Sequence, residues 1–216
     1  MSEYRDLKDQ YVNASSNSMG MHAAGTWNAD PKRLAFVLSR YKFVSKMIAG
    51  KQRVLEIGAG DAWASRIVKQ AVTELIAIDI DPVFVDNANN IENSKYPIFV
   101  ELHDFIRPYE NGKFNAVYGL DVLEHIHPDQ ESSFLKNASD ILTFDGVAIF
   151  GMPSLESQKF SSLDNGHINC KTGNDFRDVM HNYFYNVFMF SMSDEVVHTG
   201  FFPMANYLFA IGAGPR

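Results

Sequence analysis

The residues of this sequence whose types and spacing could do chemistry lie first around two closely spaced glycines. The segment VLEIGAGDAWAS (54–65) is an apolar stretch that runs into Gly58 and Gly60, with Glu56 just before them. Its apolar residues are typical of a buried parallel strand, and the glycines allow a sharp turn and a close approach to a ligand. The following segment, AWASRIVKQ, predicts a helix. Strand, glycine loop and helix in this order indicate a nucleotide-type cofactor site.

Enzymes that bind the dinucleotides NAD or FAD begin with the same elements, so an oxidoreductase is the first alternative. Their G-x-G-x-x-G pattern would place its third glycine at Trp63, whose ring would block close helix–strand packing and fill the space of a pyrophosphate. Such enzymes also rarely need a carboxylate inside the strand, where Glu56 lies. Asp79, at the end of the next strand ELIAIDID (74–81), follows Gly60 by about 20 residues, where a carboxylate can bind both hydroxyls of a ribose.

Over roughly residues 50–155, these motifs resemble the class I methyltransferases that depend on S-adenosylmethionine (SAM). In that family the E-x-G-x-G loop wraps the methionine part of SAM, the acidic end of the second strand holds the ribose, and an acidic residue after the third strand contacts adenine. Asp104 in VELHDF matches the last of these, and Ala62 stands where many members carry a third glycine. The resemblance implies SAM contacts from Glu56, Gly58, Ala59, Gly60, Asp61, Trp63, Asp79, Ile80, Asp104, Phe105, Asp121 and Val122.

Strand-like and helical segments alternate along the chain, which predicts an α/β, Rossmann-like fold with helices on both faces of a mostly parallel sheet. We expect seven strands, the last of them antiparallel. They are predicted at 53–58, 74–80, 97–103, 114–119, 146–151, 187–193 and 206–212. Helices are predicted near 32–49, 62–70, 82–92, 129–142 and 173–182.

Three local patterns refine this fold. Asp30 and Pro31 predict the N-cap and first residue of a helix. The segment RYKFVSKMI (40–48) has apolar residues at helical spacing, with its lysines on a solvated face. The aromatic run YFYNVFMF (183–190) predicts a strand buried on both faces. We expect a single methyltransferase domain over 1–216, made of an N-terminal arm or lid and helix (1–50), a SAM-binding core (51–155), and substrate-side segments with the last two strands (156–216).

Composition bounds the class of protein. The chain has 216 residues, of which 46% are hydrophobic, enough for one α/β domain with a substantial core. Its net charge of −7 and the lack of a Lys/Arg stripe count against binding nucleic acid through phosphates. The single cysteine, Cys170, excludes an internal disulfide, and the sequence shows no signal-peptide core or membrane-spanning run. We therefore expect a cytoplasmic monomer or homodimer that binds neither nucleic acid nor membrane.

Two histidines could remove the acceptor's proton. The sulfonium of SAM is already an activated methyl donor, so the protein mainly positions the acceptor and manages one proton. Histidine suits this role near neutral pH. His125 in DVLEHI and His167 in DNGHIN follow the predicted fourth and fifth strands, where open α/β sheets bind their ligands. Both are predicted to be catalytic, and the alternative for each is a structural role.

Further residues are predicted to contact the acceptor. The segment 13–28, rich in small and polar residues, is either a lid or a flexible arm, and both alternatives stay open. The segment DEVVHTGFFPM (194–204) is a polar and aromatic turn that either reaches the acceptor or is a structural hairpin. The predicted substrate contacts are His22, Trp27, Glu124, Glu195 and His198.

A metal site is a second mechanism that the sequence permits. Asp121, Glu124 and His125 resemble the E-x-x-E-H pattern of ubiquinone-pathway O-methyltransferases and small-RNA 2′-O-methyltransferases. Those enzymes bind a divalent cation, with a further histidine in the RNA enzymes. However, D-x-L-E-H also occurs in many metal-free members, and Asp121 replaces a glutamate. We therefore expect no metal site and no divalent metal cofactor.

The sequence predicts transfer of a methyl group from SAM to an oxygen, or with less support a nitrogen, of a small-molecule acceptor. The RYKFV, GHIN and EVVHTGF segments resemble methyltransferases encoded beside bacterial surface-polysaccharide genes, which implies a sugar-linked acceptor. Two other classes remain as alternatives. One is the NAD-dependent oxidoreductase, and the other is a non-catalytic SAM-binding or scaffold protein.

Overall fold

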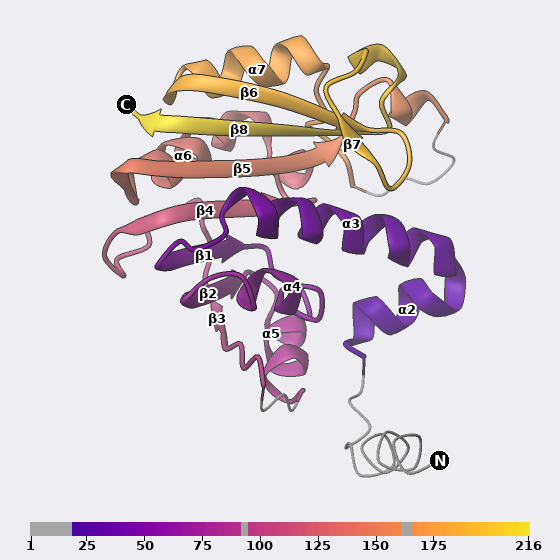
Figure 1. Ribbon diagram of the computed structural model, residues 1–216, viewed down its shortest axis with the longest axis vertical. Helices are drawn as coiled ribbons and strands as arrows, with labels where there is room; N and C mark the ends of the chain where they lie inside the picture. The colour runs from indigo at the N-terminus through magenta and orange to yellow at the C-terminus, as the bar shows by residue number, and fades with distance from the viewer. Residues whose placement is uncertain (1–18, 92–94, 161–165) are drawn as a thin grey trace, which may run out of the picture.

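The strands of the protein form one mixed sheet in a computed structural model that describes residues 19–91, 95–160 and 166–216 (Figure 1). They are β1 (Arg53–Ile57), β2 (Glu74–Asp79), β3 (Val100–Leu102), β4 (Phe114–Leu120), β5 (Leu142–Pro153), β6 (Phe184–Met192), β7 (Val197–His198) and β8 (Tyr207–Pro215). The helices are α2 (Met21–Ala29), α3 (Pro31–Met47), α4 (Arg66–Lys69), α5 (Pro82–Asn89), α6 (Pro128–Asp140) and α7 (Gly173–His181). Short 3-10 turns are η1 (Leu123–His125), η2 (Ser157–Phe160) and η3 (Phe202–Met204).

The sheet order is β3-β2-β1-β4-β5-β8-β6-β7. Strands β1 to β5 pair in parallel, whereas β8 is antiparallel to both β5 and β6. The predicted Rossmann-like fold is therefore confirmed. The predicted strand count is wrong by one, because the described residues form eight strands. The additional strand, β7, pairs only two residues with the end of β6, which is too short to show an alternating pattern in the sequence.

Several predicted boundaries differ from the observed ones, and two elements are much shorter than predicted. The helix expected near 62–70 is regular only from Arg66 to Lys69, because the chain after the glycine loop makes further turns, with a φ of 50° at Ala62. The strand expected over 97–103 pairs with β2 only from Val100 to Leu102. Both differences fall at ends of elements, where propensity alone sets no sharp limit.

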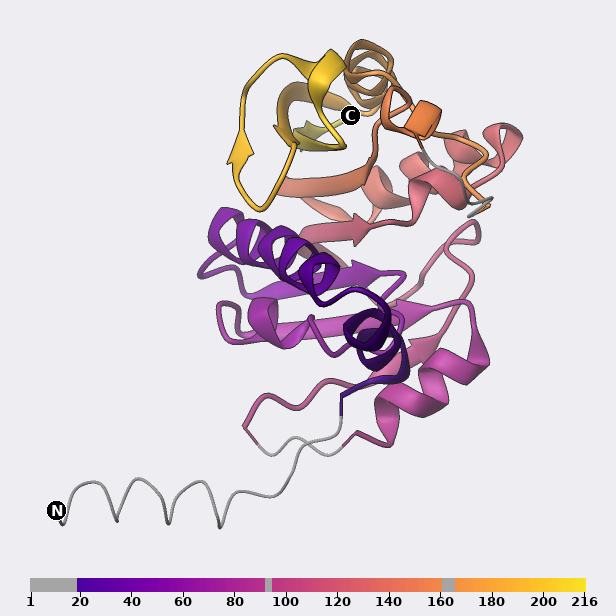
Figure 2. The same cartoon turned by 90° about the vertical axis from the view of Figure 1, so that its right-hand side faces the viewer.

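Helices cover both faces of the sheet, as Figure 2 shows for α3 and α6 on opposite sides. Alternate residues of a strand point to opposite faces. Leu55 and Val117 pack into the core that includes residues of α6 and α7, whereas Val54 and Ala116 pack into the core that includes residues of α3 and α4. The central strands are therefore apolar on both faces, as parallel strands in a covered sheet require.

Strand β6 departs from this rule. Phe184 and Met189 are buried, but Tyr185 and Phe188 expose 66% and 56% of their surface. The expectation that 183–190 is buried on both faces is thus wrong. β6 lies near the edge of the sheet, with only the two-residue β7 beyond it, and it packs mainly against α7, with Phe190 also contacting Phe43 of α3.

The N-terminal helix α3 begins where the sequence predicted. The Asp30 side chain accepts a hydrogen bond from the Lys32 N–H at 3.1 Å, and Pro31 is the first helical residue. This satisfies one of the N–H groups that a helix leaves without a partner at its start.

None of the described helices is long and apolar enough to cross a membrane.

A buried arginine joins α3 to the end of β4. Arg40 packs on the rings of both Phe36 and Tyr207, with its guanidinium carbon 4.4 and 3.8 Å from their centroids. Its guanidinium forms an ion pair with Asp121, the first residue after β4. Asp121 has a φ of 56°, a left-handed conformation that is uncommon outside glycine. The ion pair therefore holds both the helix and this turn in place.

We predict that Arg40→Ala lowers the free energy of unfolding by about 2–4 kcal/mol, because it removes the packing between two rings and leaves Asp121 without its partner. Urea unfolding measures the loss. Lys42→Ala, at an exposed position on the same helix, should change stability by no more than about 0.5 kcal/mol. Equal stability of the two variants would show that the ion pair does not anchor α3.

Candidate active site

The loop between β1 and α4 carries the predicted glycines at the carboxyl end of β1. Gly58 and Gly60 have φ values of 71° and 55°, which glycine adopts without strain. The N–H groups of Gly58 and Ala59 donate to the Ile78 carbonyl of β2 at 2.9 and 3.0 Å. A Cβ added to Gly58 would lie 2.3 Å from Cγ2 of Val122. The glycine loop thus packs directly against the segment that follows β4.

Asp79 closes this loop from the end of β2. Its Oδ2 accepts from the Gly60 N–H at 2.7 Å, and its Oδ1 accepts from the Asp81 N–H at 2.9 Å. The side chain is therefore fixed by the main chain in the absence of a ligand. Because a carboxylate offers about four acceptor positions, Asp79 can still accept hydrogen bonds from two ribose hydroxyls.

Asp61 ties the glycine loop to α2. Its Oδ2 accepts from the Ala23 N–H at 2.8 Å in the first turn of α2, and its Oδ1 accepts from the Trp63 N–H at 3.1 Å. A Cβ at Gly20 would lie 2.2 Å from the Asp61 carboxyl carbon, so the chain passes as close as glycine permits. Residues 21–28, predicted as a lid or a flexible arm, are thus a helix seated on the loop, and residues 13–18 lie outside the described residues.

Glu56 is buried on β1, inside the sheet. Burial raises its pKa to about 7, and the hydroxyls of Ser65, Tyr118 and Tyr41 only partly offset this effect. A neighbouring cationic group would restore the ionised form. SAM carries such a group on its methionine part.

The remaining predicted cofactor residues lie at the ends of β2 and β3. Ile80 exposes 64% of its surface and is available to a ligand. The Asp104 carboxylate, about one-third exposed, accepts a hydrogen bond at 3.2 Å from a nearby main-chain N–H. The Phe105 ring is buried, with its centroid 5.4 Å from that of Phe134. Its side chain belongs to the hydrophobic core, so it could contact a ligand only through its main chain.

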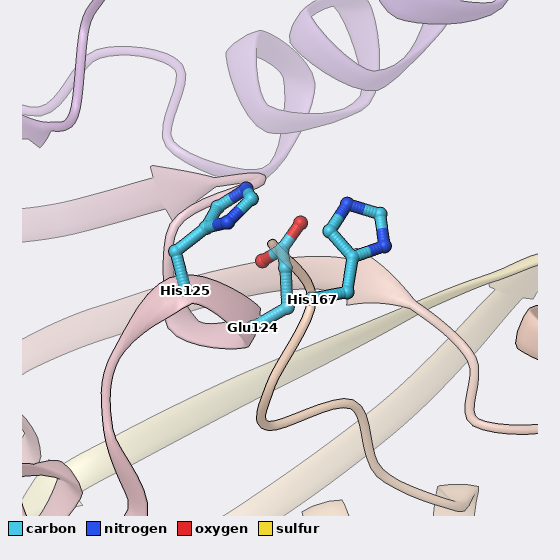
Figure 3. Close-up of side chains that lie close together, drawn as sticks. All are labelled: Glu124, His125 and His167. Carbon is cyan, nitrogen blue, oxygen red and sulfur yellow. The ribbon is translucent and has the colours of Figure 1, made fainter. Parts of the chain in front are cut away.

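The two predicted catalytic histidines lie side by side, although they come from different segments (Figure 3). Their ring centroids are 5.1 Å apart. His125 ends the η1 turn after β4, and His167 lies in the segment before α7. The N–H groups of Ile168 and Asn169 donate to the Glu124 carbonyl at 2.9 and 3.0 Å. These bonds between main-chain atoms bring His167 to the η1 turn.

Hydrogen bonds set the tautomer of both imidazoles. His125 Nδ1 lies 3.1 Å from the carbonyl oxygen of Gly166, and His167 Nδ1 lies 2.9 Å from Oε1 of Gln158. Because each oxygen can only accept, both Nδ1 atoms carry the hydrogen, and each Nε2 keeps its lone pair. Burial, with His125 nearby, also lowers the pKa of His167. The two Nε2 atoms can therefore accept a proton or bind a metal.

Glu124 lies beside the two rings and is fully buried. Neither carboxylate oxygen has a hydrogen-bond partner among the described residues. Burial, followed by the negative charge of Asp121, raises its pKa well above the usual range. One ligand atom from each of Glu124, His125 and His167 lies within 4.8 Å of the others. These three residues could together hold a metal ion.

The structure does not bring every predicted substrate residue to this cluster. His22 lies against Phe84 of α5, with ring centroids 6.3 Å apart, and Trp27 is exposed on α2. His198 accepts from the Gly200 N–H at 2.9 Å and pairs with Ser191 in the β6–β7 hairpin. Glu195 is exposed in the same turn. The contacts of His198 are therefore those of a structural hairpin, which was the alternative to acceptor contact for residues 194–204.

Sequence reasoning missed two residues of the site. Arg40 lies one helical turn from both Phe36 and Val44, and a charged residue in that apolar row was the available signal. Gln158 orients His167, but its position in the η2 turn gave no signal in the sequence.

Comparison with known proteins assigns the chain to a family. A family model described as a methyltransferase domain matches residues 26–188. The chain belongs to the methyltransferase domain family. This confirms the predicted class I SAM-dependent methyltransferase and its enzyme class. No curated protein matched the chain.

Solved methyltransferases share the fold. The N-methyltransferase NodS of Bradyrhizobium japonicum WM9, in complex with S-adenosyl-L-homocysteine (SAH), has a TM-score of 0.65 at 16% identity, and the match covers 88% of this chain and 92% of NodS. A SAM-dependent methyltransferase of Clostridium acetobutylicum ATCC 824 has a TM-score of 0.65 at 14% identity, covering 88% and 96% of the two chains. At these low sequence identities, the similarity shows that the chain shares the fold of these methyltransferases.

We predict that Glu56→Gln stabilises the ligand-free methyltransferase domain at high pH. Because folding raises the pKa of Glu56, its contribution is fully present below the pKa of the unfolded chain and is lost as pH rises through about 7. The variant should gain up to about 3 kcal/mol over the wild type at pH 8 and much less near pH 5. Urea unfolding across this range measures the difference.

Glu110→Gln, at an exposed position, is the matched control and should show no such dependence. A stability difference between Glu56→Gln and the wild type that is independent of pH would contradict the assigned burial effect.

Proposed function

We propose that the protein transfers a methyl group from SAM to an oxygen atom of a small-molecule acceptor. The observation that carries this proposal is the pair of imidazoles, His125 and His167, each with a free Nε2 next to the segment that packs on the glycine loop. A hydroxyl must lose its proton as the methyl group is transferred, and a neutral imidazole suits that task. An amine acceptor already presents a lone pair when neutral and depends less on such a base.

In this proposal SAM lies across the carboxyl ends of β1, β2 and β4 and contacts all the cofactor-binding residues predicted from the sequence. Glu56 faces the ammonium group of the methionine part, the glycine loop wraps that part, and Asp79 accepts from the ribose hydroxyls. Asp104 contacts the adenine, and Asp121 with Val122 lies between the cofactor and the acceptor. The full set is Glu56, Gly58, Ala59, Gly60, Asp61, Trp63, Asp79, Ile80, Asp104, Phe105, Asp121 and Val122.

The acceptor would lie beside His125, His167 and Glu124. β6 runs parallel to β5, because both are antiparallel to β8. The β6–β7 turn therefore lies at the carboxyl ends of the parallel strands, as the histidine cluster does. Glu195 and His198 in that turn are therefore proposed to contact the distal part of the acceptor. A sugar-linked acceptor, which the sequence resemblance implied, offers the hydroxyl that this arrangement requires.

Cofactor binding tests the first half of the proposal. SAH should bind in the micromolar range by calorimetry and NADH should not. Asp79→Ala should weaken SAH by about 30-fold or more, because a charge-assisted contact with two hydroxyls is worth on the order of 2–4 kcal/mol. Asp79→Asn, which retains the shape, should lose less. Preference for NADH would contradict the cofactor, and unchanged SAH affinity in Asp79→Ala would move the ribose elsewhere.

Turnover tests the second half. His125→Ala and His167→Ala should each lower kcat by roughly 10²–10⁴-fold while SAH affinity changes by less than about threefold, because the imidazoles act on the acceptor and not on the cofactor. His181→Ala, on α7, is the matched control and should retain activity. Full activity in both site variants would show that catalysis rests on positioning alone.

A further inference from the structure

We infer that Glu124, His125 and His167 form a divalent-cation site with open positions for the acceptor. This inference rests on the proposed function and specifies how the same cluster activates an acceptor hydroxyl: the two Nε2 atoms bind the ion instead of taking the proton themselves. It also reverses the expectation of no metal site that the sequence supported. The reason is the three-dimensional arrangement, in which residues from two segments bring one ligand atom each to within 4.8 Å of the others (Figure 3).

The distances suit a cation after small side-chain rotations. Ligand atoms that bind one transition-metal ion at about 2.0–2.2 Å lie roughly 3–3.5 Å from one another. In the ligand-free structure one such atom from each residue lies within 4.8 Å of the others. His125 is exposed and His167 is half-buried, so neither ring is held by close packing. Rotation of the Glu124 carboxylate, which has no hydrogen-bond partner among the described residues, and small tilts of the rings that keep their Nδ1 hydrogen bonds can close the remaining gap.

The outer hydrogen bonds have the arrangement that metal-binding histidines use. Such a histidine donates its second ring N–H to a carbonyl or carboxylate, which fixes the ring and raises its basicity. His125 and His167 donate from Nδ1 to the Gly166 carbonyl and to Oε1 of Gln158. Gln158 is itself held, since its amide nitrogen lies 3.1 Å from Oγ of Ser157. Both Nε2 atoms are therefore oriented for a ligand.

Glu124 supplies the charge that a cation would neutralise. Its carboxylate is buried, and both oxygens lack a hydrogen-bond partner among the described residues, which is costly unless another charge compensates it. Two cations near Glu124 are already paired, and a third, Arg33, lies near His167. Arg40 binds Asp121, and Lys171 binds Glu131 at 2.7 Å. A metal ion between Glu124 and the imidazoles would complete the charge balance.

Asp121 is not part of the coordination set in this arrangement. Its carboxylate pairs with the guanidinium of Arg40, which packs on two aromatic rings. The site therefore has three protein ligands, two imidazoles and one carboxylate. Three-ligand sites of this composition leave positions open for water and substrate.

The ligand set also selects the ion. Mg²⁺ and Ca²⁺ prefer oxygen ligands, imidazoles favour Zn²⁺, Fe²⁺ and other late first-row ions, and the single carboxylate also admits Mn²⁺. With such an ion held by the three residues, an acceptor hydroxyl bound at an open position would have a lowered pKa. The proton of the acceptor hydroxyl would pass to solvent. The hydroxyl oxygen would form the new bond to the methyl carbon of SAM, and the bond between that carbon and sulfur would break to leave the neutral thioether of SAH. No redox change is required.

Metal binding by the purified protein tests this inference directly. After treatment with chelator and dialysis, calorimetry with Zn²⁺ or Mn²⁺ should show one ion per chain, and Co²⁺ should give a visible absorption band. Glu124→Gln, His125→Ala and His167→Ala should each weaken binding at least 100-fold. Asp129→Asn, at an exposed carboxylate in the first turn of α6, is the matched control and should retain the wild-type metal affinity within about threefold.

Each variant is also titrated with SAH, and circular dichroism checks that it is folded. Absence of stoichiometric ion binding in the wild type overturns the inference, as does unchanged binding in Glu124→Gln or in both histidine variants. Loss of metal binding in Asp129→Asn, which lies outside the cluster, overturns the three-ligand assignment. If SAH binds and metal-free enzyme turns over normally, the methyltransferase proposal stands while this inference fails. Failure to bind SAH would instead contradict the proposed function.

Discussion

The ion pair between Arg40 and Asp121 is the interaction on which the arrangement of the site depends. Arg40 comes from α3, far from β4 in sequence, and it packs on the rings of Phe36 and Tyr207. Asp121 occupies a left-handed conformation directly after β4. After Asp121, the Val122 side chain packs against the glycine loop, and the chain then forms the η1 turn that carries the histidine cluster. The Arg40–Asp121 ion pair thus sets the position of the cofactor loop relative to the acceptor side.

Carboxylates fix the cofactor side in a similar way. Asp79 and Asp61 each accept two main-chain N–H groups, and these bonds join the glycine loop to the end of β2 and to the first turn of α2. The loop is therefore shaped before a ligand arrives. A site that is organised in advance loses less conformational entropy on binding. This explains why acidic residues are concentrated around a loop whose ligand also needs them.

The sequence predicted what depends on local pattern. The glycine loop, Asp79 and the central strands follow from short apolar runs that end in glycine or aspartate, and the cap of α3 follows from Asp30 and Pro31. Long-range pairing was not visible in it. The two-residue β7, the role of Arg40 and the exposure of Phe188 depend on neighbours distant in sequence. His125 and His167 could each be predicted at the end of a strand, but their contact depends on main-chain bonds to the Glu124 carbonyl.

Two buried glutamates connect stability to function. Glu56 and Glu124 both have a raised pKa chiefly because of burial, and each lies where a cationic group would restore its charge. The ligand-free fold therefore contains two groups that would be more stable as neutral isosteres. Such positions are kept where a ligand supplies the missing charge, since whatever binds only the folded state stabilises it. Asp121 and Arg40 lie near Glu124 and neutralise each other's charge. The carboxyl group left without a compensating cation is therefore Glu124, next to the two imidazoles. The electrostatics of the corner after β4 thus locate the acceptor chemistry at Glu124, His125 and His167 rather than at Asp121.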